Sequence, residues 1–219
     1  MYFPIFLIYE IYETSGGVER MEEASTDLVT AKRILIAPHA LFQRLSEGVG
    51  VGSVVRYYVL LSIILATLTP CINLLGVPSD VVHASTNAQM AAYKYSPWME
   101  QVFGISRHLW TGVLTFTFMI VKLPAFVLFY HGCAKLLGSN EGWVASLKLT
   151  VYPATPAMLF GWVPYSDFLF GLWAGFLSVP GFHYFHKIPW GKATAFAALM
   201  IGLQILYVVV SGGGWLIEP

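Results

Sequence analysis

The sequence predicts an all-α fold, a polytopic membrane helix bundle of five transmembrane helices preceded by an N-terminal amphipathic interfacial helix. Of the 219 residues, 57% are hydrophobic and only 11% are charged, against about 25% charged in an ordinary soluble domain. Such a chain cannot cover its surface with polar groups in water, so lipid is its expected solvent. Its apolar residues are gathered in five stretches near the length of about 20 residues that crosses a bilayer.

The part of the chain before the first apolar stretch divides into two segments. Residues 1–30 form an N-terminal extension, and two interpretations of it stay open. In the first, the segment is disordered or lies against the membrane or a neighbouring subunit. In the second, residues 1–20 are a gene-model extension and the true start is Met21. Residues 31–48 repeat apolar side chains at helical spacing, which predicts an amphipathic helix at the membrane interface that Pro38 starts or bends. The apolar stripe consists of Ile34, Leu35, Pro38, Leu41, Phe42 and Leu45.

Five apolar stretches are long enough to cross a bilayer as helices. They are Val54–Leu75, Leu109–Gly132, Gly142–Trp162, Ser166–Phe185 and Pro189–Val210. We expect these spans and the interfacial helix to form one domain over residues 31–211, with an external tail over residues 212–219. Between the first two spans, Pro97 suits a first helical position, so a short helix is expected to begin there and to run into the second span.

Basic residues predict the orientation, because short cytoplasmic connections of membrane proteins carry an excess of lysine and arginine. The side that holds the segment before the first span carries, among others, Lys32, Arg33, Arg44, Arg56, Lys135, Lys148, Lys187 and Lys192. The opposite side holds only Lys94 and Arg107. We therefore expect a multi-pass protein of the cell membrane with a cytoplasmic N-terminus and an external C-terminus.

Lys122 lies near the middle of the second predicted span. A charged side chain at that depth is disfavoured by roughly 2.5 to 3.5 kcal/mol on insertion scales, so it is expected to face protein or water. One interpretation is a proton or ion relay. The other is a structural lysine whose amine bonds carbonyl groups that Pro124 leaves free. The nearest acidic candidate for a partner is Asp167, at the outer end of the fourth span.

The third predicted span contains the stretch "LTVYPATPAMLFGWVP", with Pro153 and Pro156 three residues apart. Prolines remove backbone donors and bend helices, so we expect this span to be broken. Discontinuous helices recur at membrane-buried binding sites, although prolines also kink purely structural helices. Together with Lys122 and Asp167, the residues Tyr152, Pro153 and Pro156 are therefore candidates for a ligand or ion path.

Two histidines, His183 and His186, share one helical face at the cytoplasmic end of the fourth span. Their three-residue spacing can serve a metal, with His131 and Cys133 as candidates for further ligands if the helix ends meet. The alternative is anchoring at the interface and stabilisation of the helix C-terminus. No cofactor is otherwise expected.

No catalytic motif is present in the sequence. It lacks the G-x-S-x-G, H-E-x-x-H and phosphate-loop patterns that mark common hydrolase, metalloprotease and nucleotide sites. The aromatic residues fall in apolar spans rather than in a basic groove, so nucleic-acid binding is not expected. The chain is therefore expected not to be an enzyme.

Several short motifs resemble those of the Yip (Ypt-interacting protein) domain family. The family pattern has a proline and an aromatic residue in a short cytoplasmic helix, then a tyrosine followed by a proline in the third span. The family pattern ends with a tryptophan in the fourth span and a Lys-Ala pair at the start of the fifth span. The matching positions here are Pro38, Phe42, Tyr152, Pro156, Trp173, Lys192 and Ala193. The resemblance covers roughly residues 31–211.

The resemblance implies a five-span integral membrane protein with a cytoplasmic N-terminus. Eukaryotic relatives assist vesicle traffic and associate with small GTPases, but this chain lacks their "DLYGP" segment and resembles the prokaryotic type. We therefore expect a non-enzymatic protein that organises membrane lipid or partner proteins, either protein partners or a second copy in a homodimer. The alternative is a small transporter or channel that uses the broken third span and Lys122.

Overall fold

The computed structural model describes residues 17–74, 97–104, 106–163 and 166–212, and within them the side chains of residues 26–71, 97–104, 106, 109–163 and 169–206. All regular structure in these ranges is α-helical, which confirms the predicted all-α class. The order is α2 (Gly17–Ile36), α3 (Pro38–Gly48), α4 (Val51–Leu74), α7 (Arg107–Leu136), α8 (Trp143–Val151), α9 (Thr155–Phe160), α10 (Ser166–His186) and α11 (Trp190–Gly212).

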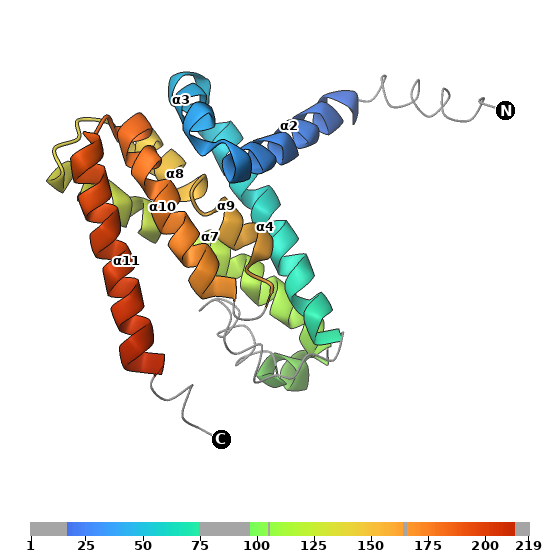
Figure 1. Ribbon diagram of the computed structural model, residues 1–219. Helices are drawn as coiled ribbons and strands as arrows, with labels where there is room; N and C mark the ends of the chain where they lie inside the picture. The colour runs from blue at the N-terminus through green and yellow to red at the C-terminus, as the bar shows by residue number, and fades with distance from the viewer. Residues whose placement is uncertain (1–16, 75–96, 105, 164–165, 213–219) are drawn as a thin grey trace.

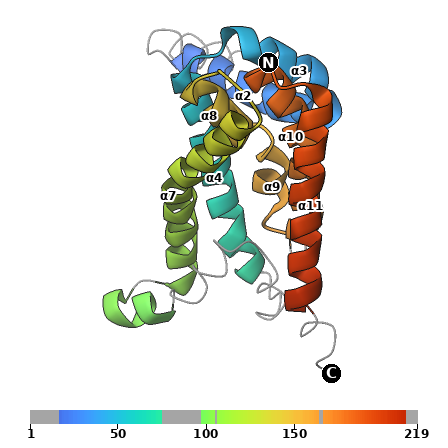
Figure 2. The same ribbon diagram turned by 90° about the vertical axis from the view of Figure 1, so that its left-hand side faces the viewer.

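The long helices run side by side, and α2 and α3 lie at one end of them (Figures 1 and 2). We call α2 and α3 the cap, and this end of the bundle the cap end. Helix α4 leads away from the cap end, α7 returns to it, α8 and α9 lead away again, α10 returns and α11 leads away (Figure 1). The helices coincide with the five apolar stretches expected from the sequence, with the third stretch divided between α8 and α9.

The prolines explain the division of the third stretch. Helix α8 ends at Val151, and the N–H of Tyr152 donates to the carbonyl of Lys148 at 3.1 Å. Pro153 has no N–H to continue this ladder, and residues 152–154 form turns. Pro156 then occupies the first turn of α9, where a missing N–H is harmless. The broken third helix is therefore present as the prolines predict.

The helix expected to begin at Pro97 is present over residues 97–103, but it does not run into α7. The backbone of Gly104 adopts φ +65°, a left-handed conformation that ends helices. Its N–H donates to the carbonyl of Glu100 at 2.8 Å. The expected continuation into the second span was wrong for this local reason.

Pro38 starts a helix rather than bending one. The residue before it, Ala37, has φ −142° and breaks the cap between α2 and α3, since the residue before a proline is driven out of the helical region. The predicted domain boundary at residue 31 falls inside α2, which begins at Gly17. The expectations for residues 1–16 and 213–219 concern parts of the chain outside the described residues.

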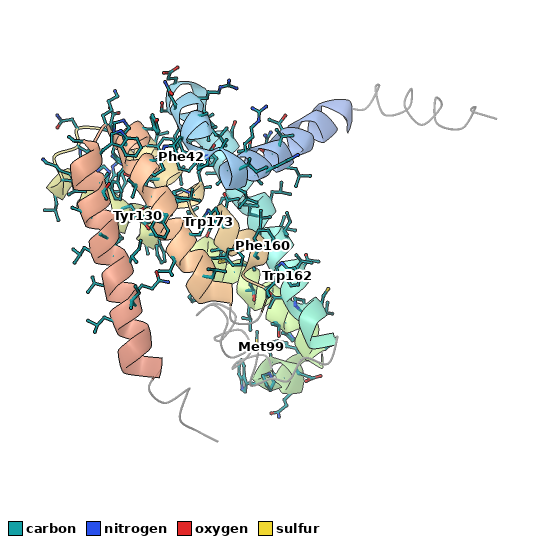
Figure 3. All side chains as sticks on the ribbon, in the orientation of Figure 1. Phe42, Met99, Tyr130, Phe160, Trp162 and Trp173 are labelled. Atoms are coloured by element: carbon teal, nitrogen blue, oxygen red, sulfur yellow. The ribbon has the colours of Figure 1, made fainter. Side chains whose placement is uncertain are left out.

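The apolar stripe of the cap is buried against the bundle. Phe42 is 0% exposed and lies where α3 meets the bundle (Figure 3). Its ring lies 5.2 Å from that of Phe185 on α10 and 6.4 Å from that of Tyr152. Lys148 on α8 is also buried and donates from Nζ to the carbonyl of Leu45 at 2.7 Å. Since the last carbonyls of a helix have no partner within it, this amine closes the end of α3. The stripe that we expected at the membrane interface thus packs largely on protein.

The outer faces of the bundle are apolar. By length and composition, two helical segments could cross a membrane, Val51–Cys71 and Leu109–Leu136, and a shorter apolar helix runs over Trp190–Leu206. Large apolar side chains of α7 and α11 point away from the rest of the fold, among them Val121, Leu128, Phe129, Leu199 and Leu206. Such faces fit a lipid environment rather than water.

Small residues bring α10 and α11 together. Gly171 of the "GLWAG" step faces the side chain of Gln204, and a Cβ on Gly175 would lie 2.8 Å from Cγ1 of Ile201. Both neighbours belong to α11, so these glycines permit close approach of the two helices. This agrees with the interpretation of the step as packing within one chain.

Candidate functional site

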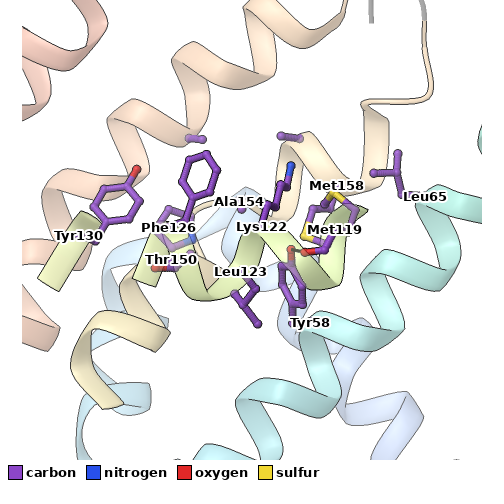
Figure 4. Close-up of a pocket in the computed structure, with 13 residues that line it drawn as sticks. Tyr58, Leu65, Met119, Lys122, Leu123, Phe126, Tyr130, Thr150, Ala154 and Met158 are labelled. Carbon is purple, nitrogen blue, oxygen red and sulfur yellow. Dashed lines mark hydrogen bonds between the residues drawn. The ribbon is translucent and has the colours of Figure 1, made fainter. Parts of the chain in front are cut away.

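A cavity of about 170 Å³ lies beside the broken helix, between α4, α7, the α8–α9 pair and α10 (Figure 4). Most of its wall is apolar, and Leu65, Met119, Leu123, Phe126, Met158 and Ala174 contribute to it. Among the described residues that line it, Lys122 is the one that carries a charge. The described part of the wall is therefore apolar with one cationic group in it.

Two hydroxyl groups of the lining, those of Tyr58 and Thr150, hold the fold. Tyr58 donates from its hydroxyl to the carbonyl of Met119 at 2.7 Å, which ties α4 to α7. Thr150 donates to the carbonyl of Ser146 one turn earlier in α8, at 2.8 Å. Both of these hydroxyl protons therefore serve backbone carbonyls.

Two phenyl rings of its own helix flank the Lys122 amine. Its Nζ lies 5.9 Å from the ring centroid of Phe118 and 5.8 Å from that of Phe126, four residues before and after it. A cation at this distance from aromatic faces is attracted by their quadrupoles. The rings therefore hold the amine beside the cavity, and the side chain is half-buried there.

The structure separates the residues expected to form a ligand or ion path. Lys122 and Pro153 both line the cavity. Tyr152 is buried elsewhere, with its ring 5.4 Å from that of Tyr57 and 6.0 Å from that of Phe185, in the core beneath the cap. Pro156 is buried at the start of α9. Asp167 lies in the first turn of α10, and its side chain is outside the described part of the chain.

Small residues that the sequence reasoning missed create the cavity. Ala154 and Ala157, around the break, and Ala174, on α10, leave space where larger side chains would close it. The alanines of the "PATPAM" stretch were a usable signal, because a proline break bordered by small residues leaves room in a helix bundle. Ala174 could not be found this way, since its position opposite the break depends on how α10 packs.

A chain of buried polar groups joins α7, α8 and α10 at the cap end. Ser146 Oγ lies 2.9 Å from Nδ1 of His131 and 3.2 Å from Nε2 of His186. Ser139 Oγ lies 3.0 Å from Nδ1 of His186 and donates to the carbonyl oxygen of the same residue. Because that donation uses the serine proton, Nδ1 of His186 carries a hydrogen. Burial lowers the pKa of His186 and so favours the neutral ring, in which Nε2 accepts from Ser146 and both nitrogens are satisfied.

The sequence interpretation assigned His183 and His186 to one possible metal site. In the structure, the two rings make hydrogen bonds to different partners. His183 donates from Nδ1 to the carbonyl of Ile188 at 2.9 Å and stacks on Trp190 with centroids 4.3 Å apart. Across the described residues, no three His, Cys, Asp or Glu side chains gather in a group that could hold a metal. The contacts favour the alternative interpretation, in which both rings anchor the end of α10.

Acidification is expected to destabilise the protein through His186, which follows the predicted fourth span. Burial, with the neighbouring His131, lowers the pKa of His186 to about 4, from about 6.5 in an unfolded chain. Between these values the unfolded state binds more protons, so stability is present above about pH 6.5 and is lost as the pH falls towards 4. Thermal unfolding in detergent at stepped pH measures this loss. His186→Gln should flatten the dependence of the unfolding temperature on pH, whereas the control His39→Gln, at an exposed position, should leave it unchanged. If both variants gave the same dependence on pH, the loss of stability would not be due to His186.

Long apolar helices with outward-facing apolar side chains, and polar groups buried at one end, are the features of a helical membrane protein. The model of the Yip1 domain family matches residues 32–212. The chain belongs to the Yip1 domain family, whose members are generally non-enzymatic membrane proteins, and the resemblance drawn from the sequence is confirmed. A comparison with curated proteins finds no match, and a comparison with solved structures finds none.

Proposed function

We propose that this protein is a non-enzymatic, five-span integral membrane protein whose cap organises anionic lipid at the cytoplasmic surface. The five crossings would be α4, α7, the α8–α9 pair, α10 and α11, with the N-terminus in the cytoplasm and the C-terminus outside. Partner proteins or a second copy of the chain could share the same surface. Membership of the Yip1 domain family supports the membrane setting.

The observation that carries this proposal is the gathering of basic residues at the cap end. Four of them hold the fold together: Arg56 pairs with Asp27, Lys187 pairs with Glu141, and Lys148 and Lys192 donate to carbonyls. Among the others whose side chains are described, Lys32, Arg33, Arg44 and Lys135 are exposed. A cytoplasmic leaflet carries a negative surface potential that attracts such residues. This supports a cytoplasmic cap end.

The cap surface combines these charges with apolar side chains. Leu28 and Ile36 of α2 are 57% and 71% exposed, and Val29 is exposed beside them. Lys32 and Arg33 lie on the same helix within a turn or two. A surface of basic and apolar residues matches the boundary between anionic headgroups and acyl chains. It supports lipid as the first partner of the cap.

Neutralising the cap charges is expected to remove its preference for anionic lipid. The variant Lys32→Gln, Arg33→Gln, Arg44→Gln loses three charges, each worth about 1 kcal/mol near an anionic surface. Retention of anionic lipid should therefore fall by about a hundredfold. The measurement is mass spectrometry of lipid that stays bound after extraction from equal mixtures of phosphatidylglycerol and phosphatidylcholine. Gln43→Ala, a neutral change at an exposed position of α3, is the control. Unchanged phosphatidylglycerol retention in the triple variant would refute the lipid role.

The transporter or channel alternative has less support. An ion path needs polar groups along its length, and the described lining of the cavity at Lys122 is mainly apolar.

A further inference from the structure

We propose that the 97–103 helix lies flat at the membrane surface on the side opposite the cap, with its apolar face between the lipid headgroups and the acyl chains. The partner of this face is the lipid surface itself. The proposal rests on the membrane insertion of α7 proposed above, but it does not depend on the lipid role of the cap. It concerns a second lipid contact, at the other end of the bundle.

The first support is the division of this helix into two faces. Successive residues of an α-helix are about 100° apart, so its apolar side chains share an arc of about 140°. The apolar arc consists of Trp98, Met99, Val102 and Phe103. Glu100 and Gln101 lie on the remaining part of the helix surface. A helix divided in this way is typical of one that lies in the plane of a membrane interface.

The second support is that the protein leaves the apolar arc largely uncovered. Trp98, Val102 and Phe103 are 59%, 52% and 56% exposed. Large apolar side chains that are exposed together mark a surface that meets a membrane or another protein. The arc therefore has a partner outside its own chain.

The contact of this helix with α7 fixes its place. The ring of Phe103 lies 5.4 Å from that of Trp110, in the first turn of α7. Figure 2 shows the 97–103 helix, in green, beside the end of α7 that is far from the cap, and lying across the direction of the long helices. If α7 crosses the membrane, a helix that lies across its direction at its end is parallel to the membrane surface.

The apolar arc continues onto the outward face of α7. Leu109 and Val113, one turn apart, are 64% and 51% exposed, and both line an open apolar groove of about 550 Å³ between α4 and α7. Because Phe103 contacts Trp110, the residue after Leu109, the two apolar surfaces meet at the start of α7. Lipid that covers this face of an inserted α7 therefore also reaches the arc.

Composition and size favour lipid over a second copy of the chain. Tryptophan is enriched at the headgroup level of membranes, because its ring is amphipathic, and Trp98 and Trp110 both lie at this end of the bundle. A helix of about two turns offers little surface beside the roughly 800 Å² that each partner buries in a stable protein interface. Glu100 is the one charged side chain of the 97–103 helix and lies on its polar face. The arc thus fits uncharged lipid, in contrast with the basic cap.

The depth of single fluorophores in phosphatidylcholine vesicles tests the proposal. In a background where alanine replaces Cys71 and Cys133, Val102→Cys places a thiol on the apolar arc, and Glu100→Cys places one on the polar face of the same helix. Val113→Cys, on the outward face of α7, reports whether α7 itself lies in lipid. Each thiol carries the fluorophore NBD. The quenchers are phosphatidylcholine with a nitroxide near the headgroup end of an acyl chain, and iodide on both sides of the membrane.

The label at Val102→Cys is expected to be quenched severalfold more by the nitroxide lipid, and severalfold less by iodide, than the label at Glu100→Cys. Equal quenching of the two labels would overturn the proposal. Protection of the label at position 102 from both quenchers would also overturn it, because a protein partner such as a second copy would then cover the arc. Mixtures with phosphatidylglycerol should give the same quenching as phosphatidylcholine alone, and a requirement for the anionic lipid would contradict an uncharged contact.

A charge on the apolar arc is expected to release the helix from the lipid. Trp98→Asp should expose the label at position 102 to iodide, whereas Gln101→Asp, which puts the same charge on the polar face, should leave it in lipid. Both positions are exposed, so neither change leaves a cavity in the fold. If Trp98→Asp and Gln101→Asp give the same quenching, lipid does not hold the arc and the proposal fails.

The label on α7 separates this proposal from the function proposed above. If iodide quenches the label at Val113→Cys, the insertion of α7 fails and this proposal fails with it. If that label lies in lipid and the label at Val102→Cys lies in water, the present proposal alone fails. Retention of phosphatidylglycerol by the cap is measured with other variants and has an independent outcome.

Discussion

Replacement of Phe42 by alanine is expected to detach the cap and to lower the free energy of unfolding by about 3–5 kcal/mol, the usual range for removing a buried phenylalanine. The ring is completely buried and packs against the rings of both Tyr152 and Phe185, which also contact each other. It joins α3 to the turn after α8 and to α10. No other side chain of α3 reaches both, among the ring contacts of the described residues. The loss should therefore concentrate in the attachment of the cap.

Limited trypsin digestion and thermal unfolding of purified protein measure the two parts of this expectation. Cleavage after Arg44 should accelerate in Phe42→Ala, and the midpoint of thermal unfolding should fall. Phe176→Ala is the matched control, because Phe176 is 65% exposed on the outer face of α10 and the same truncation leaves no cavity there. If the two variants unfold and digest alike, the cap is not held by the packing described here.

A valine at Gly112 is expected to force α4 and α7 apart. A Cβ at this position would lie 2.9 Å from the carbonyl oxygen of Ala66 in the facing helix. A backbone atom cannot rotate away as a side chain can, so one of the two helices must shift. Overpacking usually lowers the free energy of unfolding by about 1–3 kcal/mol. We expect a loss at the upper end of this range, because the added side chain meets a backbone carbonyl.

Gly202→Val provides the comparison for Gly112→Val. Gly202 lies within α11, and a Cβ there would meet nothing within 4 Å. Replacing a glycine in a helix interior by another residue is mildly favourable in itself, so this variant should unfold at the temperature of the unmodified protein or slightly above it. A lower midpoint for Gly202→Val than for Gly112→Val would show that the α4–α7 contact is not as close as the structure has it.

The positions of the helices could be predicted because they depend on local sequence. Apolar runs of near-bilayer length correspond to α4, α7, α10 and α11, and Pro153 with Pro156 predicts the break between α8 and α9. Pro38 also marks a boundary through its own geometry. These features need only backbone sterics and hydrophobic length. The failure at Gly104 is local as well, since a glycine in a polar connection gives no sign of the φ that it adopts.

The site was harder to predict, because it is made by segments far apart in the sequence. Lys148 was identified only as a basic residue marking orientation, yet it closes the end of α3, about a hundred residues earlier. His131 and His186 were considered as metal ligands, and a serine between them joins them instead. Tyr152 was expected in the ligand path and packs beneath the cap. Each outcome depends on which helix faces meet.

The topology itself is tested most directly by labelling of single cysteines from outside intact cells. The background carries alanine in place of Cys71 and Cys133. Three variants place a thiol at an exposed position: Gln43→Cys in the cap, Gln101→Cys in the 97–103 helix and Asn140→Cys in the α7–α8 connection. A fourth variant carries a cysteine appended to the C-terminus. An impermeant maleimide should label Gln101→Cys and the appended cysteine in intact cells, and the other two only after permeabilisation. Labelling of the appended cysteine and Gln43→Cys from the same side would mean an even number of crossings and would contradict the five-span account.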